Sequence, residues 1–147
     1  MGDGAEVTFR VEFADTDTQA RVYYGNYFKF FDRARFAYWE AIGCDDAGVR
    51  RCEDETVLAD VGCAYKAPVG FWDLLTVWCR VARLGRSSLR TEYRATAAPD
   101  GRLIVEGYET LVWIDRQTNR SVPVPEDIRR RIEAFEGPRL SEARSGA

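Results

Sequence analysis

The feature that most constrains the fold is an aromatic-rich segment near the N-terminus. Seven of the seventeen residues from 26 to 42 are aromatic, and the next residue is Gly43. This segment is predicted to form a helix of about 25 Å, at about 1.5 Å per residue, with Asn26 as its N-cap. So many rings would be unusual on a surface helix, so we expect a sheet to wrap around it. One apolar ridge at helical spacing comprises Tyr27, Phe30, Phe31, Ala34, Tyr38 and Ala41.

Strand-like segments joined by short turns dominate the rest of the chain. The residues from Val7 to Phe13 alternate apolar and polar side chains, as a half-buried strand does. The sequence Ala98-Pro99-Asp100-Gly101 is typical of a hairpin turn. One strand, one long helix and several linked strands predict an α+β fold, an antiparallel β-sheet curled around a central helix. The other strand candidates are residues 57–66, 74–84, 87–97 and 102–115.

Length and charge favour one soluble domain. A chain of 147 residues is too short for two ordinary domains, so we expect one domain over residues 1–136 and a disordered tail over 137–147. Residues 44–55 are predicted to form a loop or short helical turn, and 125–136 an amphipathic helix whose arginines at 129–131 face solvent. The net charge of −3 argues against nucleic-acid and anionic-membrane partners. No apolar run of about 18 residues and no secretory signal are found, which favours the cytoplasm.

The cysteines and the lack of histidine limit the possible chemistry. Cys44, Cys52, Cys63 and Cys79 show no CxxC spacing, so reduced core thiols are favoured over disulfides or a zinc site. A chain without histidine has no Ser-His-Asp or Cys-His hydrolytic site, no histidine-ligated metal and no histidine acid–base catalyst. Proton transfer or nucleophilic attack must therefore come from carboxylates, tyrosines, lysines, cysteines or backbone dipoles.

The loop between the first strand and the helix offers such groups. It carries Asp15 and Asp17 and then enters the helix through Tyr23 and Tyr24. A carboxylate beside the unpaired N–H groups of a helix N-terminus is suited to attack on a carbonyl. Asp15 lies nearer the strand end and is favoured as a capping residue. An aspartate that caps its own turn is also the structural alternative for Asp17.

Several sequence runs here match a known family in order and spacing. They are Glu12–Asp17, Val22–Tyr27, Phe31–Arg35, Tyr65–Pro68, Asp73–Leu75 and Arg83–Ser88. Together they resemble the 4-hydroxybenzoyl-CoA thioesterase family of hotdog-fold acyl-CoA thioesterases, over about residues 7–130. The resemblance implies that Asp17 is the catalytic carboxylate, as nucleophile or as general base toward water. It also implies that the backbone N–H of Tyr24 donates to the thioester carbonyl oxygen, whereas the alternative for Tyr24 is aromatic packing.

The same resemblance suggests where coenzyme A binds. In the family, the turn that matches Arg86, Ser87 and Ser88 often meets the phosphates and pantetheine, and guanidinium groups suit phosphate. Arg83 is a weaker candidate, and an ordinary solvated hairpin is the alternative. Tyr23 and Asn26 complete the candidate substrate contacts, although Asn26 is favoured as a structural cap. Ala20 stands where the family usually has glycine, so a positive φ there would strain the turn.

The favoured function is hydrolysis of an acyl- or aroyl-CoA thioester to the free acid and coenzyme A. No cofactor is implied, because coenzyme A is part of the substrate. Two alternatives stay open. One is an acyl-carrier-protein thioesterase with Arg21, Arg83 and Arg86 as a basic rim. The other is a non-catalytic acyl-CoA-binding hotdog protein in which Asp17 is structural. The resemblance also implies a homodimer with sites across the subunit interface, usually paired into a homotetramer.

Overall fold

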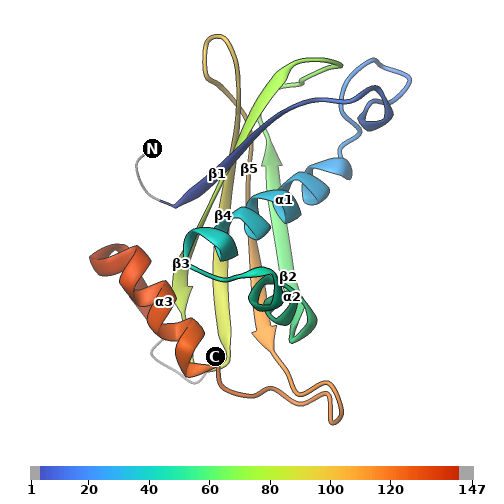
Figure 1. The fold of residues 1–147 in the computed structure, drawn as a ribbon. Helices are drawn as coiled ribbons and strands as arrows, with labels where there is room; N and C mark the ends of the chain where they lie inside the picture. The colour runs from blue at the N-terminus through green and yellow to red at the C-terminus, as the bar shows by residue number, and fades with distance from the viewer. Residues whose placement is uncertain (1–3, 143–147) are drawn as a thin grey trace.

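The computed structural model describes residues 4–142. A long helix lies across one face of a six-stranded sheet (Figure 1). The main strands follow the order β1-β3-β4-β5-β2, every neighbouring pair is antiparallel, and the predicted sheet around a central helix is confirmed. The strands are β1 (Ala5–Arg10), β2 (Thr56–Tyr65), β3 (Leu74–Leu84), β4 (Ser88–Ala97), β5 (Arg102–Trp113) and β6 (Ser141–Glu142), of which β6 pairs in parallel with β3.

The main differences from the predicted secondary structure lie at three places. The first strand ends at Arg10 rather than at residue 13, because the chain turns into a 3-10 helix at Phe13–Asp15. Residues 44–55 contain a full helix, since the Asp45 carboxylate caps its start by accepting the N–H of Gly48. Residues 137–142 form a 3-10 turn and β6 rather than a disordered tail, and 143–147 lie outside the described residues. The helices are α1 (Asn26–Ala41), α2 (Asp46–Asp54) and α3 (Glu126–Glu136).

The aromatic face of α1 forms the centre of the core. The Phe31 ring stacks on Tyr93 of β4, with ring centroids 4.5 Å apart. A Cβ at Gly107 of β5 would lie 2.6 Å from the Phe31 ring, so this position has to be glycine for the helix to pack so closely. Ala41 of the predicted ridge is exposed, whereas Arg35 and Trp39 are buried. The buried face therefore lies partly around the helix from the predicted ridge.

Arg35 is buried because carboxylates surround it. Its guanidinium donates two hydrogen bonds to Glu53 of α2, at 2.8 and 2.9 Å, and one to Glu109 of β5 at 2.7 Å. Glu109 also accepts from the Tyr93 hydroxyl. Burial raises the pKa of the Glu109 carboxyl, although the nearby Arg35 charge acts in the opposite direction. These bonds join α1 to α2 and to the sheet.

The connection before β3 and the turn after β3 lie at opposite ends of the sheet. The connection over residues 69–73, directly before β3, hydrogen-bonds to the loop that leads into α1: Val22 donates to Val69 at 2.8 Å and Trp72 to Val11 at 2.9 Å. The β3–β4 turn lies at the opposite end, after eleven residues of strand, or about 35 Å at about 3.3 Å per residue. Across residues 4–142 no helix is both long and apolar enough to cross a membrane.

Candidate active site

Asp15 organises the loop that leads into α1. The residue is only 3% exposed, and its side chain accepts hydrogen bonds from the Glu12 backbone N–H at 2.8 Å and from Lys29 at 2.6 Å. Its backbone carbonyl accepts the Tyr23 N–H at 3.0 Å and the Asn26 side-chain amide at 2.9 Å. The predicted capping role of Asp15 is therefore confirmed. Asp15 ties the start of the loop to the first turn of α1.

The entry to α1 presents free backbone donors. The N-cap is Gly25, which has no side chain that could cap the helix, so the prediction of Asn26 as N-cap is wrong by one residue. Asn26 instead uses its side chain to hold the loop through Asp15. Within residues 4–142, the backbone N–H groups of Tyr24 and Gly25 have no hydrogen-bond acceptor. Two such donors at a helix N-terminus attract a developing negative charge.

Asp17 lies on the opposite side of this loop from Arg21. The Asp17 N–H donates to the Arg21 carbonyl at 2.9 Å, and Arg21 precedes Tyr24 by three residues, or about 10 Å of extended chain. The Asp17 side chain is half-buried, and its Oδ1 accepts the Gln19 N–H at 2.8 Å. One oxygen thus caps the turn, while Oδ2 has no partner among the described residues. Ala20 in the same turn has a φ of 62°. This position therefore adopts the positive φ at which an alanine is strained.

A pocket of tyrosines opens beside the Tyr24 backbone. Its volume is about 280 Å³. The Tyr65 ring lies 5.6 Å from the Tyr27 ring and 6.3 Å from the Tyr24 ring, and its hydroxyl donates to the Tyr24 carbonyl at 3.2 Å. Burial raises the pKa of Tyr27 to about 12 and also raises the pKa of Tyr65, so both hydroxyls stay protonated and can donate hydrogen bonds near pH 7. The pocket is lined by Arg21, Val22, Tyr24, Tyr27, Tyr65, Lys66, Ala67 and Pro68.

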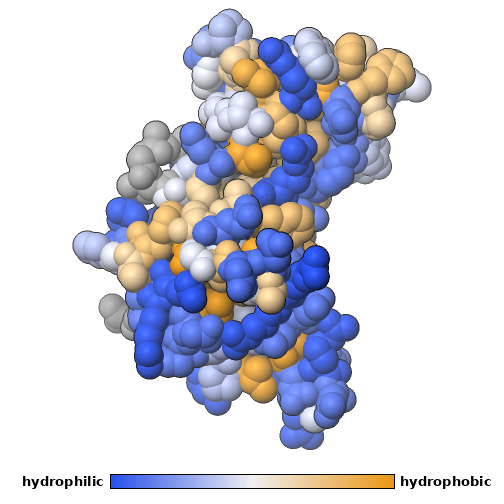
Figure 2. Space-filling view, viewed as in Figure 1, coloured by the Kyte–Doolittle hydropathy of each residue, from blue (hydrophilic) through white to orange (hydrophobic). Residues whose placement is uncertain are grey.

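The exposed aromatic side chains lie mainly at this end of the molecule. Tyr23 and Tyr24 are 45% and 62% exposed, and Phe13, Phe71 and Trp72 flank the same loops with more than half of each side chain exposed. Figure 2 shows apolar residues among hydrophilic ones at the upper end of the molecule, where these loops lie in Figure 1. Tyr23 also packs against Tyr24, with ring centroids 4.7 Å apart.

The predicted coenzyme A turn lies at the other end of the sheet. Arg83 and Arg86 are exposed, Ser87 is buried and Ser88 is half-buried. The turn closes through the Gly85 N–H and the Ser88 carbonyl at 2.7 Å. Within one chain, the structure thus groups Asp17, Tyr23, Tyr24 and Asn26 but leaves the turn about one strand length, or about 35 Å, away.

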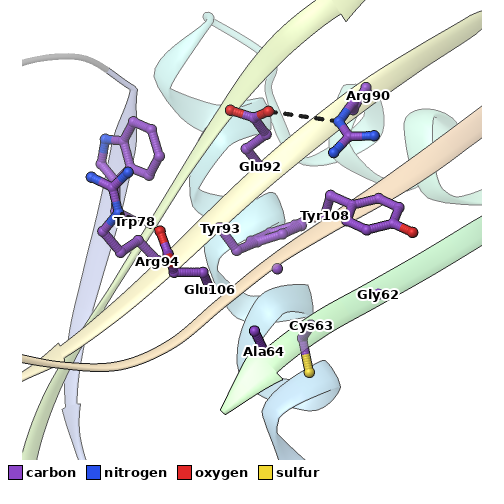
Figure 3. Close-up of a pocket in the computed structure, with 11 residues that line it drawn as sticks. Gly62, Cys63, Ala64, Trp78, Arg90, Glu92, Tyr93, Arg94, Glu106 and Tyr108 are labelled. Carbon is purple, nitrogen blue, oxygen red and sulfur yellow. Dashed lines mark ion pairs between the residues drawn. The ribbon is translucent and has the colours of Figure 1, made fainter. Parts of the chain in front are cut away.

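A larger cavity lies away from all of these residues. It measures about 580 Å³ and opens on the face of the sheet opposite α1, where Glu106 and Tyr108 alternate with the inward-facing Gly107 (Figure 3). Arg90 and Glu92 form an ion pair there at 3.6 Å, and Arg94 pairs with Glu106 at 3.7 Å. The charges on this face are thus paired, and none of the residues predicted for the site line the cavity. We therefore place the candidate site at the α1 entry.

Two residues differ from their predicted roles. Arg129, predicted to lie on a solvated helix face, donates to the carbonyls of Gly85 and Arg86 and so holds the β3–β4 turn. Cys63, predicted to be a core thiol, is only partly buried because β2 is an edge strand. Only the amphipathic pattern of α3 pointed toward Arg129, and it could not show what the side chain contacts.

The comparisons with known proteins agree with this fold. The family model of the thioesterase-like superfamily matches residues 11–132. A thioesterase from Thermus thermophilus, solved with coenzyme A and Zn, is 33% identical, with 93% of this chain and 98% of that chain covered and a TM-score of 0.81. A gentisyl-coenzyme A thioesterase is 26% identical, with 86% and 98% of the two chains covered and a TM-score of 0.74.

A shorter sequence match points the same way. A protein from Aquifex aeolicus (strain VF5), named "Putative esterase", is 32% identical over 84 residues. This match spans 57% of the present chain and 66% of that protein, just under two thirds of its length. The predicted hotdog fold is confirmed, and the chain belongs to the thioesterase-like superfamily.

Proposed function

We propose that this protein hydrolyses an acyl-CoA thioester to the free acid and coenzyme A. The observation that carries the proposal is the α1 entry, where the Tyr24 and Gly25 amides, unpaired within residues 4–142, open next to the Asp17 loop and the tyrosine pocket. The likeness to structures named as thioesterases, one of them with coenzyme A, supports the same chemistry.

The chemistry follows from these groups. Attack on the thioester moves negative charge onto the carbonyl oxygen, and the Tyr24 amide stabilises that charge without reorganising; loss of one such donor typically costs about 10²–10³ in rate. Asp17 acts either by taking a proton from the attacking water or by attacking directly to form an anhydride that water then cleaves. In the first course a water oxygen bonds to the acyl carbon, and in the second an Asp17 oxygen does so before water cleaves the anhydride. In both courses the C–S bond breaks, and the thiolate of coenzyme A leaves with the electron pair and is then protonated.

A second copy of the chain would bring the distant turn to this site. β2 is an edge of the sheet, and its side chains at Val57, Leu58, Val61 and Tyr65 are more than 40% exposed. Such a long apolar edge favours strand pairing with another chain. Antiparallel pairing centred on Val61, in the middle part of β2, sets Tyr65 opposite Val57 of the second copy.

The register of the sheet then gives the distance to the second copy's turn. Val57 pairs with Val112, and Val112 pairs with Ser88. The second copy's β3–β4 turn therefore lies three strands from Tyr65, or about 15 Å at about 4.8 Å per strand. This span is on the scale of a pantetheine arm. We therefore propose a homodimer in which one subunit supplies the Asp17 and Tyr24 groups and the other supplies Arg86 and its neighbours for coenzyme A.

The test is thiol release from a panel of acyl- and aroyl-CoA esters. We expect Asp17→Asn to lower kcat at least about 100-fold while coenzyme A binding and the melting temperature stay near those of the wild type. Asp54→Asn, which removes an exposed aspartate on α2, is the matched control and should keep full activity.

The other outcomes separate the alternatives. Unchanged turnover by Asp17→Asn would remove Asp17 from the mechanism. Binding of coenzyme A esters without turnover by the wild type would favour a non-catalytic binding protein. Turnover of carrier-protein thioesters only would favour a biosynthetic carrier thioesterase.

A further inference from the structure

The tyrosine pocket carries a charge that no described residue balances. Two of its lining residues, Arg21 and Lys66, are cationic, and no lining residue is acidic. Within residues 4–142, neither side chain forms an ion pair or a hydrogen bond, and Arg21 makes none with Asp17 although their backbones are bonded. The cavity on the outer face of the sheet is different, since Arg90 and Arg94 are paired there with glutamates.

The two lysines of the chain differ in their surroundings. Among its 21 basic residues, the lysines are Lys29 and Lys66. Lys29 pairs with the buried Asp15 carboxylate at 2.6 Å. Lys66 directly follows β2, where its own N–H donates to the Ile104 carbonyl at 2.8 Å. Its backbone is therefore held at the rim of the pocket, and its charge lacks a partner in the part of the chain that the structure describes.

The position of the two cations indicates which part of a ligand they meet. The pocket includes the Tyr24 side chain, and the Tyr24 amide is the proposed contact of the thioester carbonyl. The phosphates of coenzyme A lie at the far end of the pantetheine arm from that carbonyl. A pocket that adjoins the carbonyl therefore receives the acyl group. Its tyrosine rings suit an apolar or aromatic body, and its two cations suit an anion at the end of that body.

We infer that the acyl group taken by this site carries its own carboxylate, which Arg21 and Lys66 bind. The inference rests on the proposed thioesterase function. It names the substrate class as the coenzyme A thioester of a dicarboxylic acid with an aromatic or short aliphatic body.

Two matched pairs of esters test the inference. The pairs are benzoyl-CoA with 3-carboxybenzoyl-CoA, and hexanoyl-CoA with 5-carboxypentanoyl-CoA. The readout is the ratio of kcat/KM for the charged ester to that for the neutral one. We expect a wild-type ratio of about ten or more, since hydrogen bonds to a charged group typically give at least a tenfold gain in binding. The ratio should fall at high salt, because both cations lie near solvent.

Variants of the two cations identify the source of the ratio. Lys66→Met and Arg21→Met should each lower it about tenfold, Lys66→Arg should retain most of it, and Lys66→Glu should favour the neutral ester. Arg120→Met removes an exposed arginine far from the pocket and should leave the ratio unchanged.

The inference and the proposed function fail in different ways. A wild-type ratio near one overturns the inference. The inference is also overturned if Lys66→Met and Arg21→Met leave the ratio unchanged while turnover of both esters falls together, and that result assigns the cations to coenzyme A. Hydrolysis of the neutral esters would continue in that case. Failure to hydrolyse any ester would instead overturn the proposed function and the inference with it.

Discussion

Replacement of Arg35 by methionine should remove more stability than replacement of any exposed arginine. Arg35 is 5% exposed and donates to Glu53, Glu109 and Asp32. Methionine keeps much of the side-chain volume but leaves Glu109, which is 1% exposed, with the Tyr93 hydroxyl as its remaining side-chain donor among the described residues. Breaking a buried pair in this way costs about 3–5 kcal/mol, which lowers the melting temperature by about 10 °C in a chain of this size.

The loss should also depend on pH. The folded-state pKa of Glu109 lies above its ordinary value of 4.5, so the folded state binds more protons and this group becomes less favourable as pH rises through that range. Without the Arg35 charge the pKa of Glu109 rises further, and the loss of stability with rising pH becomes larger. Burial raises the pKa of Glu53, but hydrogen bonds from Arg35 outweigh burial and lower it, so Glu53 contributes stability above its unfolded pKa that Arg35→Met loses. The destabilisation should therefore be larger at pH 7.5 than at pH 5.

Urea unfolding at the two pH values measures this effect. Arg50→Met, at an exposed position of α2, is the matched control and should change the unfolding free energy by less than about 0.5 kcal/mol. Adding Glu109→Gln to Arg35→Met should restore part of the loss, because it removes the stranded charge. A loss below about 1 kcal/mol, or one that is equal at both pH values, would contradict the reasoning.

Two further predictions concern the loop and α3. Ala20→Gly should raise the unfolding free energy by about 0.5–1 kcal/mol, because glycine adopts the observed φ of 62° without strain; a lower melting temperature would show that the turn is not strained. Tyr38→Phe should cost about 1–3 kcal/mol in chemical denaturation, since the Tyr38 hydroxyl donates at 2.6 Å to Glu136, a fully buried carboxylate whose other oxygen has no hydrogen-bond partner among the described residues. Near-neutral behaviour of Tyr38→Phe would mean that Glu136 does not need this bond.

Local patterns predicted the secondary structure well. The strand over residues 74–84 was predicted with the observed limits, and α1 with one residue of difference at its C-terminal end. The predicted N-cap of α1 was wrong by one residue, because the Asn26 side chain bonds to the Asp15 carbonyl instead of capping the helix. The predicted end of β1 was wrong by three residues, because Phe13 belongs to the 3-10 turn rather than to the strand. The charged motif around Arg35 gave no sign of burial, since its partners Glu53 and Glu109 are 18 and 74 residues away.

The candidate site was also only partly predictable from the sequence. The order of strand, turn and helix predicts a carboxylate beside a helix N-terminus, whereas the family resemblance identifies Asp17 and Tyr24, and their catalytic roles stay predictions. Which donors are free at the α1 entry depends on the hydrogen bonds of Asp15, which motif spacing cannot show. The unpaired charges of Arg21 and Lys66 became visible only when the fold placed them in one pocket.

By itself, the sequence determined the helix, the strands and the exclusion of histidine chemistry, because periodicity, turn residues and composition are properties of neighbouring residues. Only the tertiary structure decided that Arg35 is a buried ion-pair centre, that Arg129 holds the β3–β4 turn, and that this turn lies a strand length from Asp17 within one chain. These facts depend on which segments pair across the sheet, and that pairing is set by contacts between residues far apart in the chain.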